Sequence, residues 1–105
     1  MVNLFVYGTL RNPSLRKKLL KRHIDHLPGK LRKYKKIFIK YKGEKYPLII
    51  KSRKSNVNGF IFKVNNNDLK ILDNYEDKIY KRVKVNLNEG LKAYVYRPDY
   101  YKIRN

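Results

Sequence analysis

The sequence predicts an α+β domain whose strands are largely joined by hairpins and curl into a small barrel. Three observations predict it: about five or six apolar or alternating segments, two helix patterns that follow asparagine caps, and no internal repeat or linker. With 105 residues and 42% hydrophobic content, the chain is expected to form one domain, residues 1–105, with a single modest core.

The N-terminal segment predicts a strand followed by a helix. Residues 3–7 are an apolar run that ends at Gly8, as expected for a buried strand. Asn12 can cap a helix, and Pro13 suits its first position because the missing N–H would be unpaired there. Leucines then place one apolar stripe on a helix that runs to about Arg22.

The middle of the chain predicts extended structure. Residues 28–29 (Pro-Gly) mark a turn, and an extended pattern follows over residues 30–42. Residues 46–50 and 59–64 are expected to form two further strands, joined by a polar loop over residues 51–57.

The last third predicts a short helix and a hairpin. Leucine and tyrosine recur at a spacing of three over residues 67–76, after an asparagine-rich turn and cap. Residues 80–88 and 91–97 are expected strands with a turn at residues 88–90. The first of these strands has two faces, one with Val83, Val85 and Leu87 and the other with Tyr80, Arg82 and Lys84.

Composition narrows the function classes. The chain has no cysteine, which excludes disulfides, thiol catalysis and thiolate metal sites and fits a cytoplasmic protein. No apolar stretch approaches the roughly 20 residues that span a membrane. Lys+Arg number 27 against 8 Asp+Glu, a formal charge of +19, which leaves a polyanion such as nucleic acid open as a partner. We favour compositional bias, because the lysines are spread along the chain.

The segment Tyr7-Gly8-Thr9-Leu10-Arg11 is a candidate binding loop. A strand end followed by glycine and a helix start exposes N–H groups that can hold a carboxylate, phosphate or oxyanion. Gly8 permits a sharp turn and the close approach of a ligand, Thr9 can add a hydroxyl donor, and Arg11 supplies a positive charge. An ordinary strand-to-helix connection is the alternative.

Glu76 is a candidate acid or base. An acid at the C-terminal end of a helix is unfavourable, because the carbonyl groups there are already negative. We therefore expect a functional role for an acid at this position. Such a site raises the pKa of a carboxyl group and suits it to proton transfer. The alternative is that Asp73 or Glu76 pairs with a lysine or arginine on the surface.

Other chemistries are disfavoured. His23 and His26 are expected to have no acid or cysteine companions and to face solvent, so no metal site is predicted. The serines lack the context of a nucleophile elbow, and phosphate-loop and dinucleotide fingerprints are absent. The tyrosines can stack on bases, but the aromatic signature of an RNA-recognition motif is missing.

Six stretches form an ordered set between residues 4 and 97: Phe5-Val6-Tyr7-Gly8-Thr9-Leu10, Tyr46-Pro47-Leu48-Ile49, residues 59–64, Leu72-Asp73-Asn74-Tyr75-Glu76, Tyr80-Lys81-Arg82 and Tyr94-Val95-Tyr96. This set resembles the γ-glutamylcyclotransferase-like family, including its γ-glutamylamine cyclotransferase and AIG2-like branches. The resemblance implies a small mixed, largely antiparallel β-barrel with two flanking helices. It also implies release of 5-oxoproline from a γ-glutamyl substrate by its own α-amine, with no cofactor and no metal.

The resemblance also implies roles for single residues. Glu76 matches the catalytic glutamate, and the substrate loop matches Tyr7, Gly8, Thr9 and Leu10. The residues that match positions lining or bracing the pocket are Tyr80, Arg82 and Tyr96. Asp77-Lys78 follows the acid where many relatives have glycine, so a different loop and a raised pKa of Glu76 are expected. A nucleic-acid-binding module and a catalytically silent relative that binds a small carboxylate are the alternatives.

Overall fold

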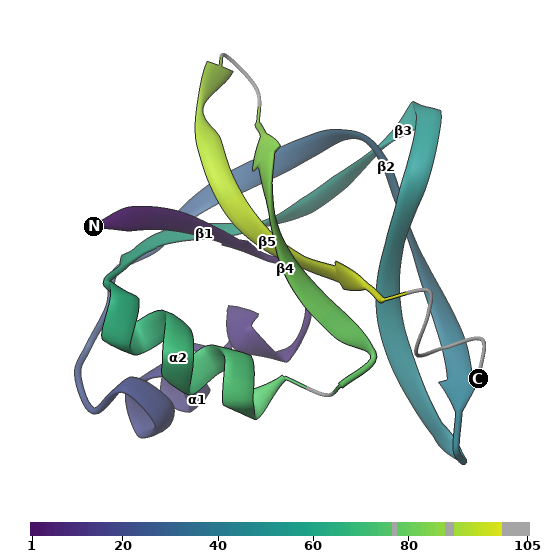
Figure 1. Cartoon of the computed structure of the whole chain (residues 1–105). Coiled ribbons are helices and arrows are strands. Elements are labelled where there is room, and N and C mark those ends of the chain that lie inside the picture. Colours follow the sequence, from purple (N-terminus) through teal and green to yellow (C-terminus); the bar gives the residue numbers. More distant parts are fainter. Residues whose placement is uncertain (77, 88–89, 100–105) are drawn as a thin grey trace.

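The computed structural model describes residues 1–76, 78–87 and 90–99. One five-stranded sheet has the order β2-β3-β1-β5-β4, made of β1 (Val2–Val6), β2 (Leu27–Tyr41), β3 (Glu44–Val64), β4 (Tyr80–Asn86) and β5 (Lys92–Pro98). All neighbouring strands are antiparallel except β1 and β5, which run parallel. The sheet curls into half a barrel, and both helices lie below it in Figure 1. The structure thus confirms the predicted mixed, largely antiparallel fold with two helices.

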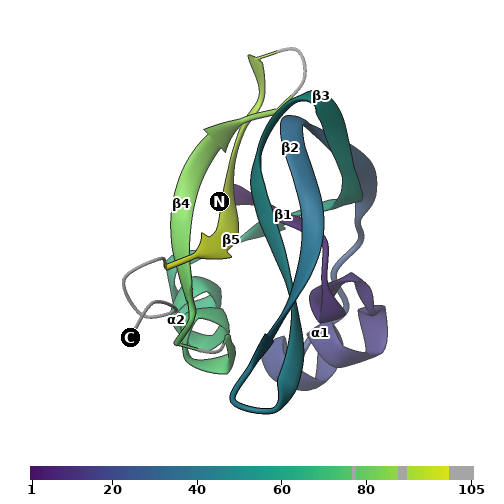
Figure 2. The ribbon, with the colours of Figure 1, turned by 90° about the vertical axis from the view of Figure 1, so that its right-hand side faces the viewer.

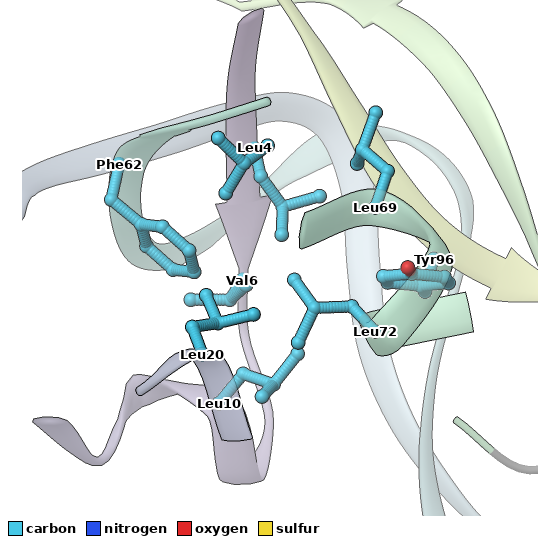
Figure 3. Close-up of a cluster of buried hydrophobic side chains, with 9 residues drawn as sticks. Leu4, Val6, Leu10, Leu20, Phe62, Leu69, Leu72 and Tyr96 are labelled. Carbon is cyan, nitrogen blue, oxygen red and sulfur yellow. The ribbon is translucent and has the colours of Figure 1, made fainter. Parts of the chain in front are cut away.

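Strand β1 is the centre of the fold because it packs on both faces. Leu4 and Val6 point to one side and Phe5 to the other, and all three are buried. On the first side lies a cluster with the helices, in which Leu20 and Leu72 point toward Val6 (Figure 3). Phe5 belongs to a second cluster formed with β2, β3 and β5. The two clusters together bury the strand that leads into the 7–11 loop (residues 7–11).

Both helices begin at asparagine caps. In α1 (Pro13–Leu20) the side chain of Asn12 accepts a hydrogen bond of 2.9 Å from the N–H of Ser14. In α2 (Asn66–Tyr75) Asn65 and Asp68 form a reciprocal capping box, with bonds of 2.8 and 2.9 Å. A short 3₁₀ helix, η1 (Thr9–Arg11), precedes α1. No helix in the described part of the chain is long and apolar enough to cross a membrane.

The structure corrects the predicted loop over residues 51–57. These residues belong to one continuous strand, β3, which pairs with β2 over residues 44–51 and again over residues 56–61. Pairing on both sides of the segment keeps the chain extended, and Val57 is buried within it. A bulge between Arg32 and Tyr34 absorbs the mismatch in register.

The turn predicted at residues 28–29 is also wrong, because both residues lie within β2. Gly29 pairs with Gly59 of β3. A Cβ atom on Gly59 would lie 2.2 Å from the carbonyl oxygen of Val6, and one on Gly29 would lie 2.6 Å from Ile61. These glycines therefore allow a close approach of chains rather than a turn. Residues 88 and 89 of the other predicted turn lie outside the described residues.

Candidate active site

A pocket of about 330 Å³ lies where three parts of the fold meet. They are the 7–11 loop, the C-terminal end of α2, and the start of β3 at the tip of the long β2–β3 hairpin, which runs down between the two helices in the view of Figure 2. The lining residues are Phe5, Val6, Tyr7, Gly8, Thr9, Leu10, Glu44, Lys45, Tyr46, Pro47, Tyr75, Glu76, Tyr80 and Tyr96. A volume of this size suits a small organic substrate.

The 7–11 loop contributes backbone donors. Strand β1 ends at Val6, and η1 begins after Gly8, whose carbonyl accepts a bond of 3.1 Å from the N–H of Arg11. The first N–H groups of a 3₁₀ turn have no acceptor within it. Gly8 has a φ of −118°, so the turn does not use the left-handed region. A Cβ here would lie 3.5 Å from Pro47, so glycine keeps the space between loop and hairpin open.

Two buried or half-buried cations hold this loop in place. The ammonium of Lys36, on β2, donates a 2.9 Å hydrogen bond to the carbonyl of Tyr7. Burial, and then the nearby charge of Arg11, lower the pKa of Lys36. Arg16 on α1 is 1% exposed and donates from one nitrogen to the carbonyls of Leu10 and Arg11, at 3.0 and 3.1 Å.

Glu76 stands beside the loop. It caps the C-terminal end of α2, where its N–H donates a 2.9 Å bond to the carbonyl of Leu72, and its half-buried side chain lines the pocket. The hydroxyl of the preceding residue, Tyr75, shares a 3.0 Å hydrogen bond with that of Thr9. This bond joins the end of α2 to the 7–11 loop. A carboxylate and a set of amide donors therefore line one pocket, as acid–base chemistry on a small anionic substrate requires.

Tyr80 and Tyr96 form part of the pocket wall. The hydroxyl of Tyr80 donates a 2.6 Å bond to the carbonyl of Pro47, and the hydroxyl of Tyr96 donates a 2.6 Å bond to the carboxylate of Asp73. Burial raises the pKa of Tyr96 strongly, and Asp73 and the charge of Glu76 raise it further. Tyr96 is therefore neutral and remains a hydrogen-bond donor at physiological pH.

Arg11 and Arg82 do not line this pocket. Arg11 donates to the carbonyl of Gly8 at 3.1 Å. Arg82 pairs with Asp73 at 3.0 Å and packs over the ring of Tyr94. Arg82 thus acts on the pocket through Asp73, which holds Tyr96. The sequence left open that Asp73 or Glu76 pairs with a lysine or arginine, and the structure shows such an ion pair between Asp73 and Arg82. Asp77 lies outside the described residues.

Sequence reasoning missed the hairpin wall of the pocket. Nothing local connects Glu44 with Glu76, because only the path of the β2–β3 hairpin brings its tip to the end of α2. Tyr75, which also lines the pocket, was assigned only to the apolar face of its helix. The signal in the sequence for this wall was the stretch Tyr46-Pro47-Leu48-Ile49, one of those that carry the family resemblance.

The histidines lie away from the pocket lining. His23 is exposed and pairs with Asp25 at 2.8 Å, whereas His26, expected to face solvent, packs against Phe60 and contacts the guanidinium of Arg16. Within residues 1–76, 78–87 and 90–99, no group of three or more His, Asp or Glu side chains is placed to hold a metal ion.

Comparison with known proteins gives a consistent family. Residues 4–104 match the profile of the family described as "Gamma-glutamyl cyclotransferase, AIG2-like". "AIG2-like protein C" of Arabidopsis thaliana is 37% identical over 81 residues, which cover 76% of this chain and 46% of that protein. The chain thus spans about half the length of the curated relatives it matches.

Solved structures agree. The solution structure of a protein from Arabidopsis thaliana superposes with a TM-score of 0.78 and 29% identity, covering 99% of this chain and 67% of that one. A structure named "Gamma-glutamyl cyclotransferase" has a TM-score of 0.74 at 20% identity, covering 92% and 66%, and shares the fold. The chain belongs to the gamma-glutamyl cyclotransferase, AIG2-like family.

Proposed function

We propose that this protein releases 5-oxoproline from a γ-glutamyl amine or γ-glutamyl amino acid by intramolecular aminolysis. The observation that carries the proposal is that Glu76 and residues 7–10 of the loop line one pocket, where the Thr9–Tyr75 hydrogen bond joins the loop to the end of α2. These are the residues that match the catalytic and substrate-binding positions of the family, and Glu76 is the proposed general acid and base.

The reaction needs no external nucleophile. The α-amine of the substrate attacks its own γ-carbonyl carbon, a C–N bond closes the five-membered lactam, and the bond to the leaving nitrogen breaks. The α-nitrogen loses two protons on its way from ammonium to lactam N–H, and the leaving nitrogen gains two as it departs as an ammonium. Glu76 relays these protons one at a time from the first nitrogen to the second, so protons balance and no water is consumed. Because both reacting groups belong to one molecule, binding mainly has to select the folded-back conformer.

The pocket supplies donors for the charges of this substrate. Amide groups at the start of η1 can hold the glutamyl α-carboxylate or the oxyanion that develops on the γ-carbonyl. Tyr96, kept neutral by burial and held by Asp73, and Tyr80 form the adjoining wall. Lys36 and Arg16 bind the loop carbonyls from behind and so keep the amide groups directed at the substrate.

The test is a 5-oxoproline assay with γ-glutamyl dipeptides, γ-glutamyl-ε-lysine and glutathione. We expect Glu76→Gln to keep the circular dichroism spectrum and melting temperature but to lose about 10²- to 10⁴-fold in turnover. Asp25→Asn, which removes an exposed carboxylate outside the pocket lining, is the matched control and should keep full activity. Full activity of Glu76→Gln would reject the proposed role.

A catalytically silent carboxylate-binding relative gives a different result. In that case 5-oxoproline or glutamate perturbs NMR resonances of the 7–11 loop, but no substrate of the panel is ever converted.

A further inference from the structure

The hairpin wall of the pocket carries a second carboxylate. Glu44 is the first residue of β3 and lines the same pocket as Glu76. The chain has 27 Lys+Arg against 8 Asp+Glu. Among the described lining residues the balance is reversed, because two glutamates face a single lysine and no arginine. The described lining of the pocket therefore carries more acid than base and can favour a cation.

Glu44 is bound by one tyrosine, Tyr46, which packs against a second, Tyr80. Its carboxylate accepts a 2.8 Å hydrogen bond from the hydroxyl of Tyr46. The ring of Tyr46 packs edge-on against Tyr80, with centroids 6.4 Å apart, and Tyr80 is in turn bonded to the carbonyl of Pro47. Glu44 is exposed and Glu76 half-buried, so the two acids mark an outer and an inner position of the same pocket.

The nearby cations are bound to other groups. The ammonium of Lys45 lies 4.7 Å from the centroid of the Phe38 ring, which is not part of the pocket lining. Lys36 and Arg11 donate to the carbonyls of Tyr7 and Gly8. None of these contacts involves the carboxylate of Glu44.

This arrangement suits a leaving group that ends in an ammonium. If the 7–11 loop and Glu76 hold the γ-glutamyl part, the departing amine extends along the remaining wall. This wall contains Glu44, Tyr46 and Tyr80, together with Pro47 and with Lys45, whose ammonium lies against the Phe38 ring. Aromatic faces and a carboxylate both attract an ammonium, whereas a carboxylate at the same place would be repelled by Glu44. We infer that Glu44 makes the enzyme selective for γ-glutamyl derivatives of diamines or polyamines over those of uncharged amines. This inference rests on the proposed function.

The test uses two substrates of equal length. γ-Glutamyl-1,4-diaminobutane ends in an ammonium, and γ-glutamyl-n-pentylamine replaces that ammonium with a methyl group. We expect kcat/KM for the diamine derivative to exceed that for the pentyl derivative by about tenfold, the worth of one partly exposed ion pair supported by aromatic contact. In Glu44→Gln this ratio should fall to about one. In Asp25→Asn, the charge-matched control, the ratio should be kept.

A binding measurement separates the two proposals. Titration with 1,4-diaminobutane should shift NMR resonances of Tyr46 and Tyr80 in the wild type but not in Glu44→Gln. Turnover of both substrates at equal rates, unchanged in Glu44→Gln, would overturn the selectivity and leave the proposed function standing. Glu44-dependent binding of the diamine with no turnover of any γ-glutamyl compound would support the cation subsite and overturn the proposed function. If the protein neither binds the diamine nor turns over any γ-glutamyl compound, both the cation subsite and the proposed function are overturned.

Discussion

A single buried arginine contacts both the 7–11 loop and the segment after α1. Besides the carbonyls of Leu10 and Arg11, the Arg16 guanidinium donates to the carbonyl of Ile24 at 3.3 Å. It also lies 4.7 Å from the centroid of the Phe62 ring. Burial lowers the pKa of Arg16, a cost that these contacts offset. Arg16 is therefore a positioning residue, because it acts on the substrate only through the shape of the loop.

Replacement of Arg16 should affect both stability and substrate binding. In Arg16→Met the loop carbonyls lose buried donors, so we expect the free energy of unfolding to fall by about 2 kcal/mol. KM should rise severalfold, with a smaller change in kcat, and Arg16→Lys should recover part of the loss. Chemical denaturation and 5-oxoproline kinetics measure these effects, with the exposed Lys17→Met on the same helix as control. A stability loss with unchanged KM would show that Arg16 has no role in positioning the loop.

Helix α2 is the element that places Glu76, and its N-terminal end is bound by an ion pair. Asp68 is 2% exposed, closes the capping box with Asn65, and accepts two hydrogen bonds from Arg22. The hydrogen bonds from Arg22 lower the pKa of Asp68 against the opposing effect of burial. One residue thus couples the start of α2 to the chain that follows α1.

This ion pair predicts how stability depends on pH. Because the pKa of Asp68 is depressed on folding, its contribution is present above the ordinary aspartate pKa of about 3.9 and is lost as pH falls through the lower folded value. We expect Asp68→Asn to cost about 1–3 kcal/mol at pH 7 and to flatten the acid limb of the stability profile below about pH 4. Urea unfolding followed by circular dichroism from pH 7 to pH 2 measures this. Asp25→Asn is the control, and an equally steep acid limb in both variants would contradict the assignment.

Positive charge occurs on most elements of the described chain, and the β2–β3 hairpin carries a large share of it. Lysine or arginine occurs on both α-helices and on every strand except the central β1. A field of this kind attracts polyanions without a defined site, and salt screens it within about 8 Å at 0.15 M. We expect this charge to reflect composition rather than a dedicated nucleic-acid surface.

The corresponding prediction concerns salt. We expect the protein to retard single-stranded and duplex RNA or DNA in a gel at about 0.02 M salt and to lose this binding near 0.15 M. Non-specific binding is driven by the release of counterions from the nucleic acid, and this release becomes less favourable as the salt concentration rises. Retention at the higher salt, reduced by replacing Lys51 and Arg53 of β3 with glutamine, would instead favour a nucleic-acid-binding function.

Much of the fold follows from local chemistry. The break of β1 at Gly8 and the asparagine caps of both helices depend on neighbours within a few residues, so the sequence predicts them directly. The continuity of β3 through residues 51–57 depends on the hairpin with β2, in which paired residues such as Leu31 and Val57 are well separated in sequence. No periodicity of polar residues reveals this pairing.

The same distinction applies to the pocket. The sequence alone determined the two helix starts, the glycine turn after β1 and the acid at the end of α2, because each depends on short-range hydrogen bonding and steric preference. Only the tertiary structure decided that Glu44 lines the pocket with Glu76 and that Arg82 acts through Asp73. These placements depend on the twist and length of the β2–β3 hairpin and on the order of the strands, which set distances between residues that share no local pattern.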